Sequence, residues 1–229
     1  MTILAPGAPL ARRWLWPARS RARVALPAKD LASVERVARQ LFGRALRRDE
    51  YAGLGGAPDD GLVRVGVTGA RLWLEVVDPR RFRYASAHLV CQGRFGPVLA
   101  SGGLRILDPR LRGKGIGLQM ARRQLIASRR LGVRSILAHG GRGAGEIGYY
   151  FGPRLGFDSP LPEQVARSLP SLLRPARSIL DLMQSQSGRD WWREHGVELD
   201  LVFDLGRDSR CWSVFWRYLS TWGQAGIRD

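Results

Sequence analysis

The stretch RLRGKGIGLQM, residues 110–120, joins a predicted strand to a predicted helix, and this connection is the strongest indication of the fold. Its centre consists of three alternate glycines framed by two cations: Arg112, Gly113, Lys114, Gly115, Ile116 and Gly117. A glycine-rich turn that enters a helix exposes free backbone N–H groups at the positive end of the helix dipole. The turn is therefore suited to a phosphate or pyrophosphate group, with Arg112 and Lys114 as mobile cations beside it.

The residues after this turn carry the clearest helical pattern in the chain. From Ile116 to Leu131 most apolar side chains fall on one broad arc, and arginines fill most of the opposite arc. Gly132 then occupies a typical position after a helix end, and VRSILAH, residues 133–139, indicates a short buried strand. A strand that follows a helical crossover is expected to lie parallel to the strand before it.

Four strand-like runs precede the turn and are joined by short, glycine-containing connections. These runs predict an antiparallel meander at residues 62–67, 71–77, 83–92 and 97–107. An earlier helix should begin after Asp30, and VELDLVFDL, residues 197–205, predicts a late strand before a final helix. That helix carries an aromatic stripe, which we interpret as core packing and not as a ligand or partner groove: Trp212, Phe215, Trp216, Leu219 and Trp222. The pattern indicates an α/β fold: a central, mostly antiparallel mixed sheet flanked by helices, with a helical C-terminal elaboration.

The chain of 229 residues is long enough for one domain with an appendage. We expect a flexible basic N-terminal arm at 1–27, a core at 28–160, and a helical elaboration with a late strand at 161–229 in the same domain. No apolar run is long enough to span a membrane, and the N-terminal run is broken by prolines and arginines. We therefore expect a cytoplasmic protein that does not bind membranes.

The chain is strongly basic, with 37 basic against 20 acidic residues and a formal charge of +17. Such a field attracts nucleic acids and other anions. The arginines are spread along the whole chain, however, and only Lys29 and Lys114 are lysine. A compositional bias toward arginine therefore explains the charge as well as an anionic partner does. The cysteines and histidines are dispersed, and nothing indicates a metal site.

Two common nucleotide motifs do not fit the turn. The P-loop needs a Ser or Thr after its lysine, and the dinucleotide motif needs a third glycine where Leu118 stands. The pattern Arg-x-x-Gly-x-Gly at 112–117 instead resembles the acetyl-CoA-binding motif of the GNAT superfamily of N-acetyltransferases. The resemblance covers about residues 98–157, including the closing RLGF at 154–157, and the segment from 191 to 205 is similar to bacterial GNAT-like proteins.

The resemblance implies a GNAT-type acyl-CoA N-acyltransferase fold and an activity. The enzyme would transfer an acetyl group from acetyl-CoA, its co-substrate, to a primary amine of an unknown acceptor, without a metal. Residues 112–117 would cradle the pyrophosphate of CoA, and the backbones of Ile106 and Leu107 would pair with its pantetheine arm.

The catalytic residues are less clearly indicated. Many relatives carry a proton-donating tyrosine four residues before the glycine of the GF pair, where this chain has Gly152. We expect Tyr150, and next Tyr149, to protonate the leaving thiolate, unless both tyrosines only pack a helix end. Glu146 is the nearest candidate base, and other candidates are Glu75, Asp78 and His139. His88 is a further candidate, but a single histidine on an apolar strand is more often a core residue than a catalytic one.

A second interpretation comes from Gly152. A GNAT-like module without the usual tyrosine could have lost catalysis and bind RNA, tRNA or a protein partner through its basic surface. The sequence also leaves open a homodimer.

Overall fold

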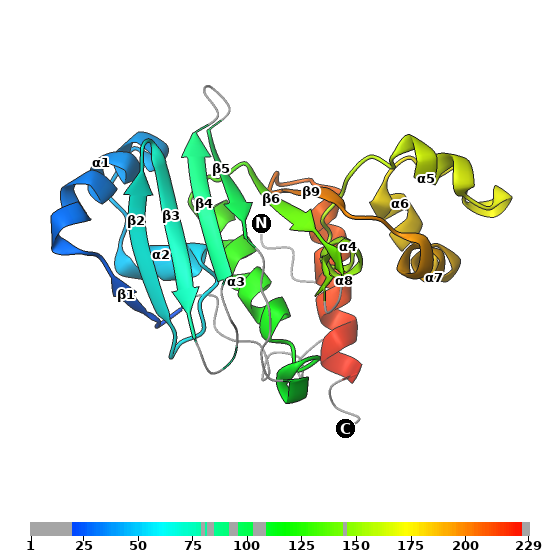
Figure 1. Ribbon diagram of the computed structural model, residues 1–229, viewed down its shortest axis with the longest axis horizontal. Coiled ribbons are helices and arrows are strands. Elements are labelled where there is room, and N and C mark those ends of the chain that lie inside the picture. Colours follow the sequence, from blue (N-terminus) through cyan, green and yellow to red (C-terminus); the bar gives the residue numbers. More distant parts are fainter. Residues whose placement is uncertain are drawn as a thin grey trace.

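The computed structural model describes residues 20–78, 81, 85–91, 96–102, 109–143 and 146–225. Within these residues, helices flank a seven-stranded mixed sheet, which places the chain in the α/β class (Figure 1). The sheet strands are β1 (Arg23–Ala25), β2 (Leu62–Thr68), β3 (Arg71–Val77), β4 (Ala85–Cys91), β5 (Pro97–Ser101), β6 (Ser135–Gly140) and β9 (Leu199–Asp204). The α-helices are α1 (Leu31–Phe42), α2 (Arg48–Leu54), α3 (Ile116–Arg130), α4 (Gly148–Arg154), α5 (Glu163–Ser168), α6 (Ile179–Met183), α7 (Gln186–His195) and α8 (Arg210–Ala225).

The order of the sheet is β1-β2-β3-β4-β5-β6-β9. Strands β2 to β5 form an antiparallel meander, β6 lies parallel to β5, and β9 lies antiparallel to β6. The predicted meander, the parallel strand after the α3 crossover and the late strand are thus confirmed. The predicted helices α1 and α3 also lie where the sequence placed them.

The first sheet strand lies inside the segment that we expected to be an arm. Residues 23–25 pair in parallel with β2, and the Ser20 hydroxyl donates a 2.7 Å hydrogen bond to the Ala57 carbonyl. Residues 1–19 lie outside the described part of the chain. The boundary at residue 27 is therefore too late, because three residues are too few to show a period-2 pattern. The short helix α2, at 48–54, was not expected either.

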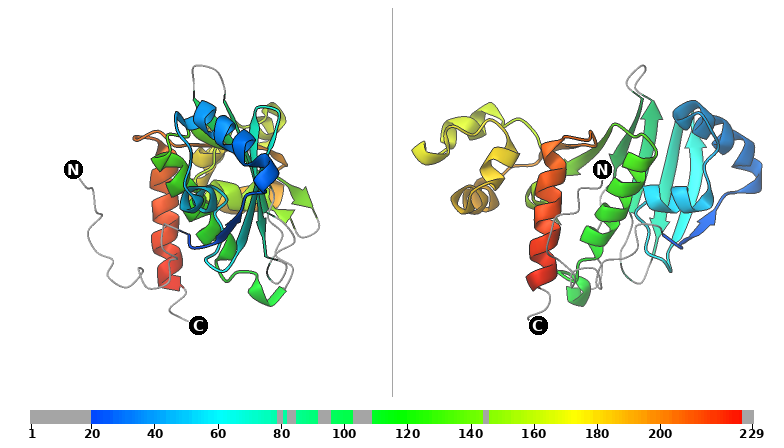
Figure 2. Two further views of the ribbon diagram at one scale, coloured as in Figure 1. Left: turned by 90° about the vertical axis from the view of Figure 1, so that its left-hand side faces the viewer. Right: turned by 180° about the vertical axis from the view of Figure 1, so that it is seen from behind.

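Side chains alternate across the meander, and only one set of them is buried. Val63 and Val65 of β2 stand opposite Val76 and Leu74 of β3, and all four are buried. Helix α1 packs on β2, β3 and β4, and α2 packs on α3 (Figure 2). Most of the alternate positions are half-buried or exposed, and His88 is one of the exposed ones. The expectation that His88 is a core residue is therefore wrong, because its strand is apolar on one face only.

The C-terminal residues complete the sheet and add a helical lobe. Strand β9 carries Phe203, which is fully buried and makes edge-to-face contacts with Trp212 and Phe215 of α8. Helix α8 lies beside α3, where the Arg129 guanidinium stands 4.9 Å from the Trp212 ring centroid (Figure 2). Helices α5, α6 and α7 form the lobe at one end of the molecule (Figure 1). None of the described helices is both long and apolar enough to cross a membrane.

Candidate functional site

The glycine turn has the backbone conformation that its sequence predicts. Gly113 and Gly115 have φ angles of +75° and +78°, in the left-handed region that side chains disfavour. Gly115 is the N-cap of α3, and its carbonyl accepts the first helical hydrogen bond from the Gln119 N–H at 2.9 Å. The N–H groups of the first helical turn have no partner within the helix, so they are available to an anion.

Two exposed cations flank this helix start. Arg112 and Lys114 stand on either side of Gly113, and neither forms an ion pair with an acidic residue that the structure describes. A Cβ at Gly113 would meet nothing within 4 Å, so this part of the turn faces open space. The turn therefore combines unpaired donors, positive charge and access. Ile106 and Leu107, expected to line the same site, lie outside the described residues.

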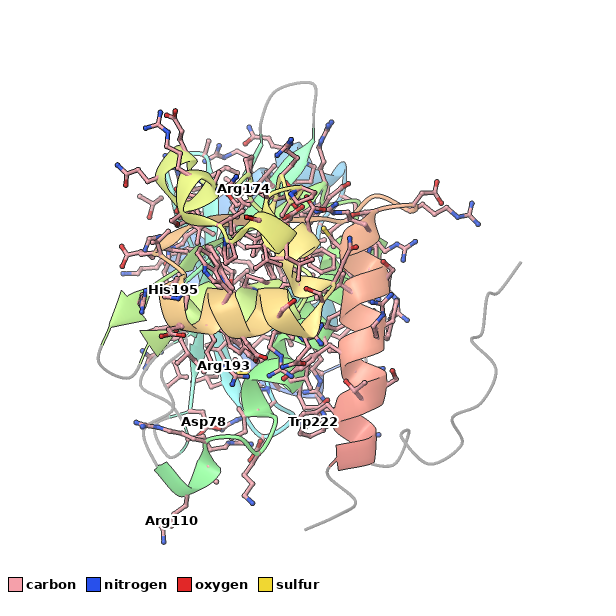
Figure 3. All side chains as sticks on the ribbon, turned by 90° about the vertical axis from the view of Figure 1, so that its right-hand side faces the viewer. Asp78, Arg110, Arg174, Arg193, His195 and Trp222 are labelled. Carbon is pink, nitrogen blue, oxygen red and sulfur yellow. The ribbon has the colours of Figure 1, made fainter. Side chains whose placement is uncertain are left out.

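The indole of Trp222, on α8, covers Gly115. A Cβ built on Gly115 would lie 2.4 Å from Cζ2 of Trp222 and 2.5 Å from its Cη2, distances that real side chains do not reach. Gly115 therefore serves two purposes, the left-handed turn and the close approach of the indole. Figure 3 shows Trp222 near the lower end of α8. In the sequence this tryptophan was the last member of an aromatic stripe, which we interpreted as core.

The other members of that stripe divide between core and surface. Trp212, Phe215 and Leu219 are buried, as a core stripe should be, whereas Trp216 is 45% exposed. The interpretation as core therefore holds for the first turns of α8 and is wrong for Trp216.

The sheet changes its pairing next to the turn. Strand β5 pairs with β6 as far as Ser101 opposite Ala138, whereas β6 continues to Gly140 with β9 as its described neighbour. The arrowheads of β5 and β6 point in different directions in Figure 1. Among the residues that the structure describes, no strand pairs with residues 139–140 on the side of β5, so an extended chain bound there could pair with their backbone.

Helix α4 carries both candidate tyrosines and packs closely on β9 through glycine. A Cβ at Gly152 would lie 2.6 Å from the Leu201 Cδ1 atom, and one at Gly140 would lie 3.0 Å from the same atom. The position where the sequence resemblance would place a tyrosine is thus closed by Leu201. The tyrosines at 149 and 150 lie in the first turn of this helix.

Tyr149 has a structural role. It is 9% exposed, and its hydroxyl donates a 2.8 Å hydrogen bond to the Arg193 carbonyl. The Trp192 indole N–H donates to the Tyr149 carbonyl at 2.8 Å. These two bonds fasten α7 to α4. A phenol whose proton already serves a carbonyl is poorly placed to protonate a leaving group.

Tyr150 has the opposite arrangement. Its hydroxyl accepts a 2.9 Å hydrogen bond from Nη2 of Arg193, so its own proton is not used in that bond. The Arg193 and Arg154 guanidinium carbons stand 5.0 Å and 5.6 Å from the centroid of its ring. The bond to Tyr150 raises the pKa of Arg193, which stays charged. Of the two tyrosines, Tyr150 is better suited to give up a proton.

Helix α8 connects the tyrosine with the glycine turn. Arg154 also stands 4.6 Å from the ring of Tyr218, and burial raises the pKa of that phenol while Arg154 opposes the rise. Tyr218 and Trp222 are four residues apart on α8, which places them on the same face, about 6 Å apart along the axis. One helix turn therefore separates Tyr218, which shares the Arg154 guanidinium with Tyr150, from Trp222, whose indole lies on Gly115.

The candidate bases lie in other environments. The side chain of Glu146 lies outside the described residues, and its backbone belongs to the short strand β8 (Glu146–Ile147). Three of the remaining candidates form ion pairs, and His88 is exposed on β4. The pairs are Asp78 with Arg81, Glu75 with Arg64 at 3.3 Å, and His139 with Glu198 at 3.0 Å and with Asp200 at 3.1 Å. None of these four pairs includes a residue of the glycine turn or α4.

Comparisons with known proteins add no assignment to this geometry. No protein-family model matches the chain, and no curated protein matches it. The sequence reasoning missed four residues that the fold brings to the site: Arg154, Arg193, Tyr218 and Trp222. The i, i+4 spacing of the last two could have indicated a shared face, but nothing in the sequence linked α7 to α4.

Proposed function

We propose that the protein is an acetyl-CoA-dependent N-acetyltransferase of the GNAT type. The observation that carries the proposal is the start of α3, where two left-handed glycines, free N–H groups and two exposed cations meet beside a divergence of the sheet. In this proposal residues 112–117 hold the pyrophosphate of CoA. The thioester then lies toward β5 and β6, on the side of α4.

The chemistry needs one proton donor and one proton acceptor. The amine nitrogen of the acceptor attacks the thioester carbonyl, a C–N bond forms, the C–S bond breaks, and the nitrogen loses a proton. Tyr150 gives its proton to the leaving thiolate, and the proton released by the nitrogen restores the phenol through solvent. Arg193, which donates to the Tyr150 oxygen, stabilises the transient phenolate.

Calorimetric titration with acetyl-CoA tests the proposal, using charge-reversal variants chosen from the structure. Arg112→Glu and Lys114→Glu change exposed cations of the turn without placing a side chain on a strained glycine. Arg130→Glu is the control, because it makes the same charge change at the exposed far end of α3. Gly115→Glu is less informative, since its side chain would displace Trp222.

We expect the two turn variants to weaken acetyl-CoA binding by roughly 10-fold each and the control by much less, because a charge-assisted hydrogen bond contributes about 1.5 kcal/mol or more. Absence of binding to the wild-type protein, or equal losses in all three variants, would contradict the proposal. In that case the RNA-binding interpretation would be examined next.

A further inference from the structure

Two arginines beside Tyr150 have no acidic partner among the residues that the structure describes. Arg154 and Arg193 come from α4 and α7, and both approach the same phenol ring. Arg193 is exposed and Arg154 is half-buried. The Arg154 guanidinium lies over the rings of Tyr150 and Tyr218. The Arg193 guanidinium lies over the ring of Tyr150 and donates to its hydroxyl.

Several nearby carboxylates are committed elsewhere. Asp158 and Asp181 both pair with Arg210, at 2.8 Å and 2.9 Å. Asp190, which acts electrostatically on Arg193, accepts two 2.8 Å hydrogen bonds from the Gln186 amide. The two guanidinium groups therefore keep most of their donors for solvent or for a ligand.

The rings hold these guanidinium groups in place. A guanidinium within about 6 Å of an aromatic centroid is attracted to the face of the ring, which restricts the side chain without using its hydrogen-bond donors. A planar guanidinium fixed in this way matches a carboxylate or a phosphate, which it can bind through two parallel hydrogen bonds.

We infer that Arg154 and Arg193 form an anion-binding subsite, and that the acceptor amine carries a carboxylate or phosphate group that binds there. The inference rests on the proposed function, since it takes Tyr150 to lie at the reacting end of the acceptor site. The class of acceptor would thus be a small anionic amine and not a polycation. The high positive charge of the chain favours the same class.

The test compares amines that differ only in the anionic group. Ethylamine, 3-aminopropanoate and 2-aminoethyl phosphate are offered as acceptors, and the release of free thiol from acetyl-CoA is followed. Arg154→Gln and Arg193→Gln are compared with Arg36→Gln, which removes the same charge from an exposed site on α1, at the other end of the sheet (Figure 1). A separate titration with inorganic phosphate measures the subsite without catalysis.

We expect kcat/KM to be roughly 10- to 100-fold higher for one or both anionic amines than for ethylamine. The better anion shows whether the subsite prefers carboxylate or phosphate. Arg154→Gln and Arg193→Gln should remove this preference and weaken phosphate binding, whereas Arg36→Gln should change neither.

The failures of the two proposals are distinguishable. If acetyl-CoA binds but the three amines react equally, the anion subsite is wrong and the proposed function stands. If acetyl-CoA does not bind, or no amine reacts, the phosphate titration tests the anion subsite without catalysis. Equal phosphate affinity in wild type, Arg154→Gln and Arg193→Gln overturns the subsite.

Discussion

At the scale of single residues, the glycines of the turn differ in what surrounds them. Gly113 and Gly115 share a left-handed backbone, yet only Gly115 is covered by another side chain. The sequence identified both as turn glycines because the pattern of glycine and cations is local. It could not identify the cover, because Trp222 is more than a hundred residues away in the chain.

The pair provides a matched test of the Trp222 contact. Gly113→Ala should lower the free energy of unfolding by about 1–2 kcal/mol, the cost of a left-handed residue with a Cβ. Gly115→Ala should lower it by about 1–3 kcal/mol more, because the new methyl group must displace the indole. Urea denaturation of the two variants measures the difference. Equal losses would show that the indole does not rest on Gly115 in solution.

At the scale of elements, the contact between α4 and α7 determines where both tyrosines lie. Trp192 is fully buried and Tyr149 nearly so, and their two hydrogen bonds join the helices. The sequence predicted helical structure at both places and proposed Tyr150 ahead of Tyr149. It could not give the reason, because the hydroxyl partners of both tyrosines belong to Arg193 on another helix.

Replacing Trp192 tests this connection. Trp192→Phe keeps most of the apolar volume but leaves the Tyr149 carbonyl without its donor. We expect a loss of about 1–3 kcal/mol in the free energy of unfolding, the usual cost of an unpaired buried polar group. Trp191→Phe is the control, because that neighbouring indole is only half-buried. Thermal unfolding of both variants would contradict the assignment if Trp191→Phe were the more damaging.

The pairing of β6 with β9 should depend on pH through His139. Hydrogen bonds that the His139 ring donates to the carboxylates of Asp200 and Glu198 raise the pKa of His139 above its ordinary 6.5. A raised pKa in the folded state stabilises the fold fully below pH 6.5, and this contribution is lost as pH rises through the higher, folded value. His139→Gln should therefore lose stability near pH 5.5 and little near pH 9.

The size of that effect is limited by exposure. His139 is 57% exposed, so we expect no more than about 1 kcal/mol at low ionic strength, decreasing with added salt. Urea denaturation at the two pH values measures it. A loss that is equal at both values would mean that the charged imidazole has no role in the pairing.

At the scale of the whole molecule, the α/β class, the meander and the α3 crossover could be predicted, because each depends on periodicity within a short window. The short strand β1 and helix α2 could not, because each is too short for a period to show. The position of α8 against α3 depends on tertiary contacts, and only the apolar stripe of α8 could be recognised in the sequence. The same limit applies to the site. The glycine turn could be recognised from the sequence because it is local, whereas the roles of Arg154 and Arg193 could not.

The charge of the whole chain leads to a prediction about nucleic acid. With a formal charge of +17 the protein should bind single-stranded RNA at low salt without regard to sequence. The affinity should fall by about 100-fold or more between roughly 50 and 200 mM salt, because binding releases counterions. Fluorescence anisotropy with two unrelated RNA sequences measures it. A steep salt dependence without any binding of acetyl-CoA would favour the RNA-binding interpretation, whereas an affinity that changes little with salt would contradict binding through the basic surface.

The contact between Gly115 and Trp222 joins two parts of the chain that are made at different times during translation. A ribosome adds roughly 5–20 residues per second, so it makes Trp222 several seconds after the glycine turn. The meander and α3 emerge first and contain mostly local contacts, which allows them to fold early. The nascent protein therefore passes through a stage in which the turn has been made but is uncovered, and the indole closes over it later.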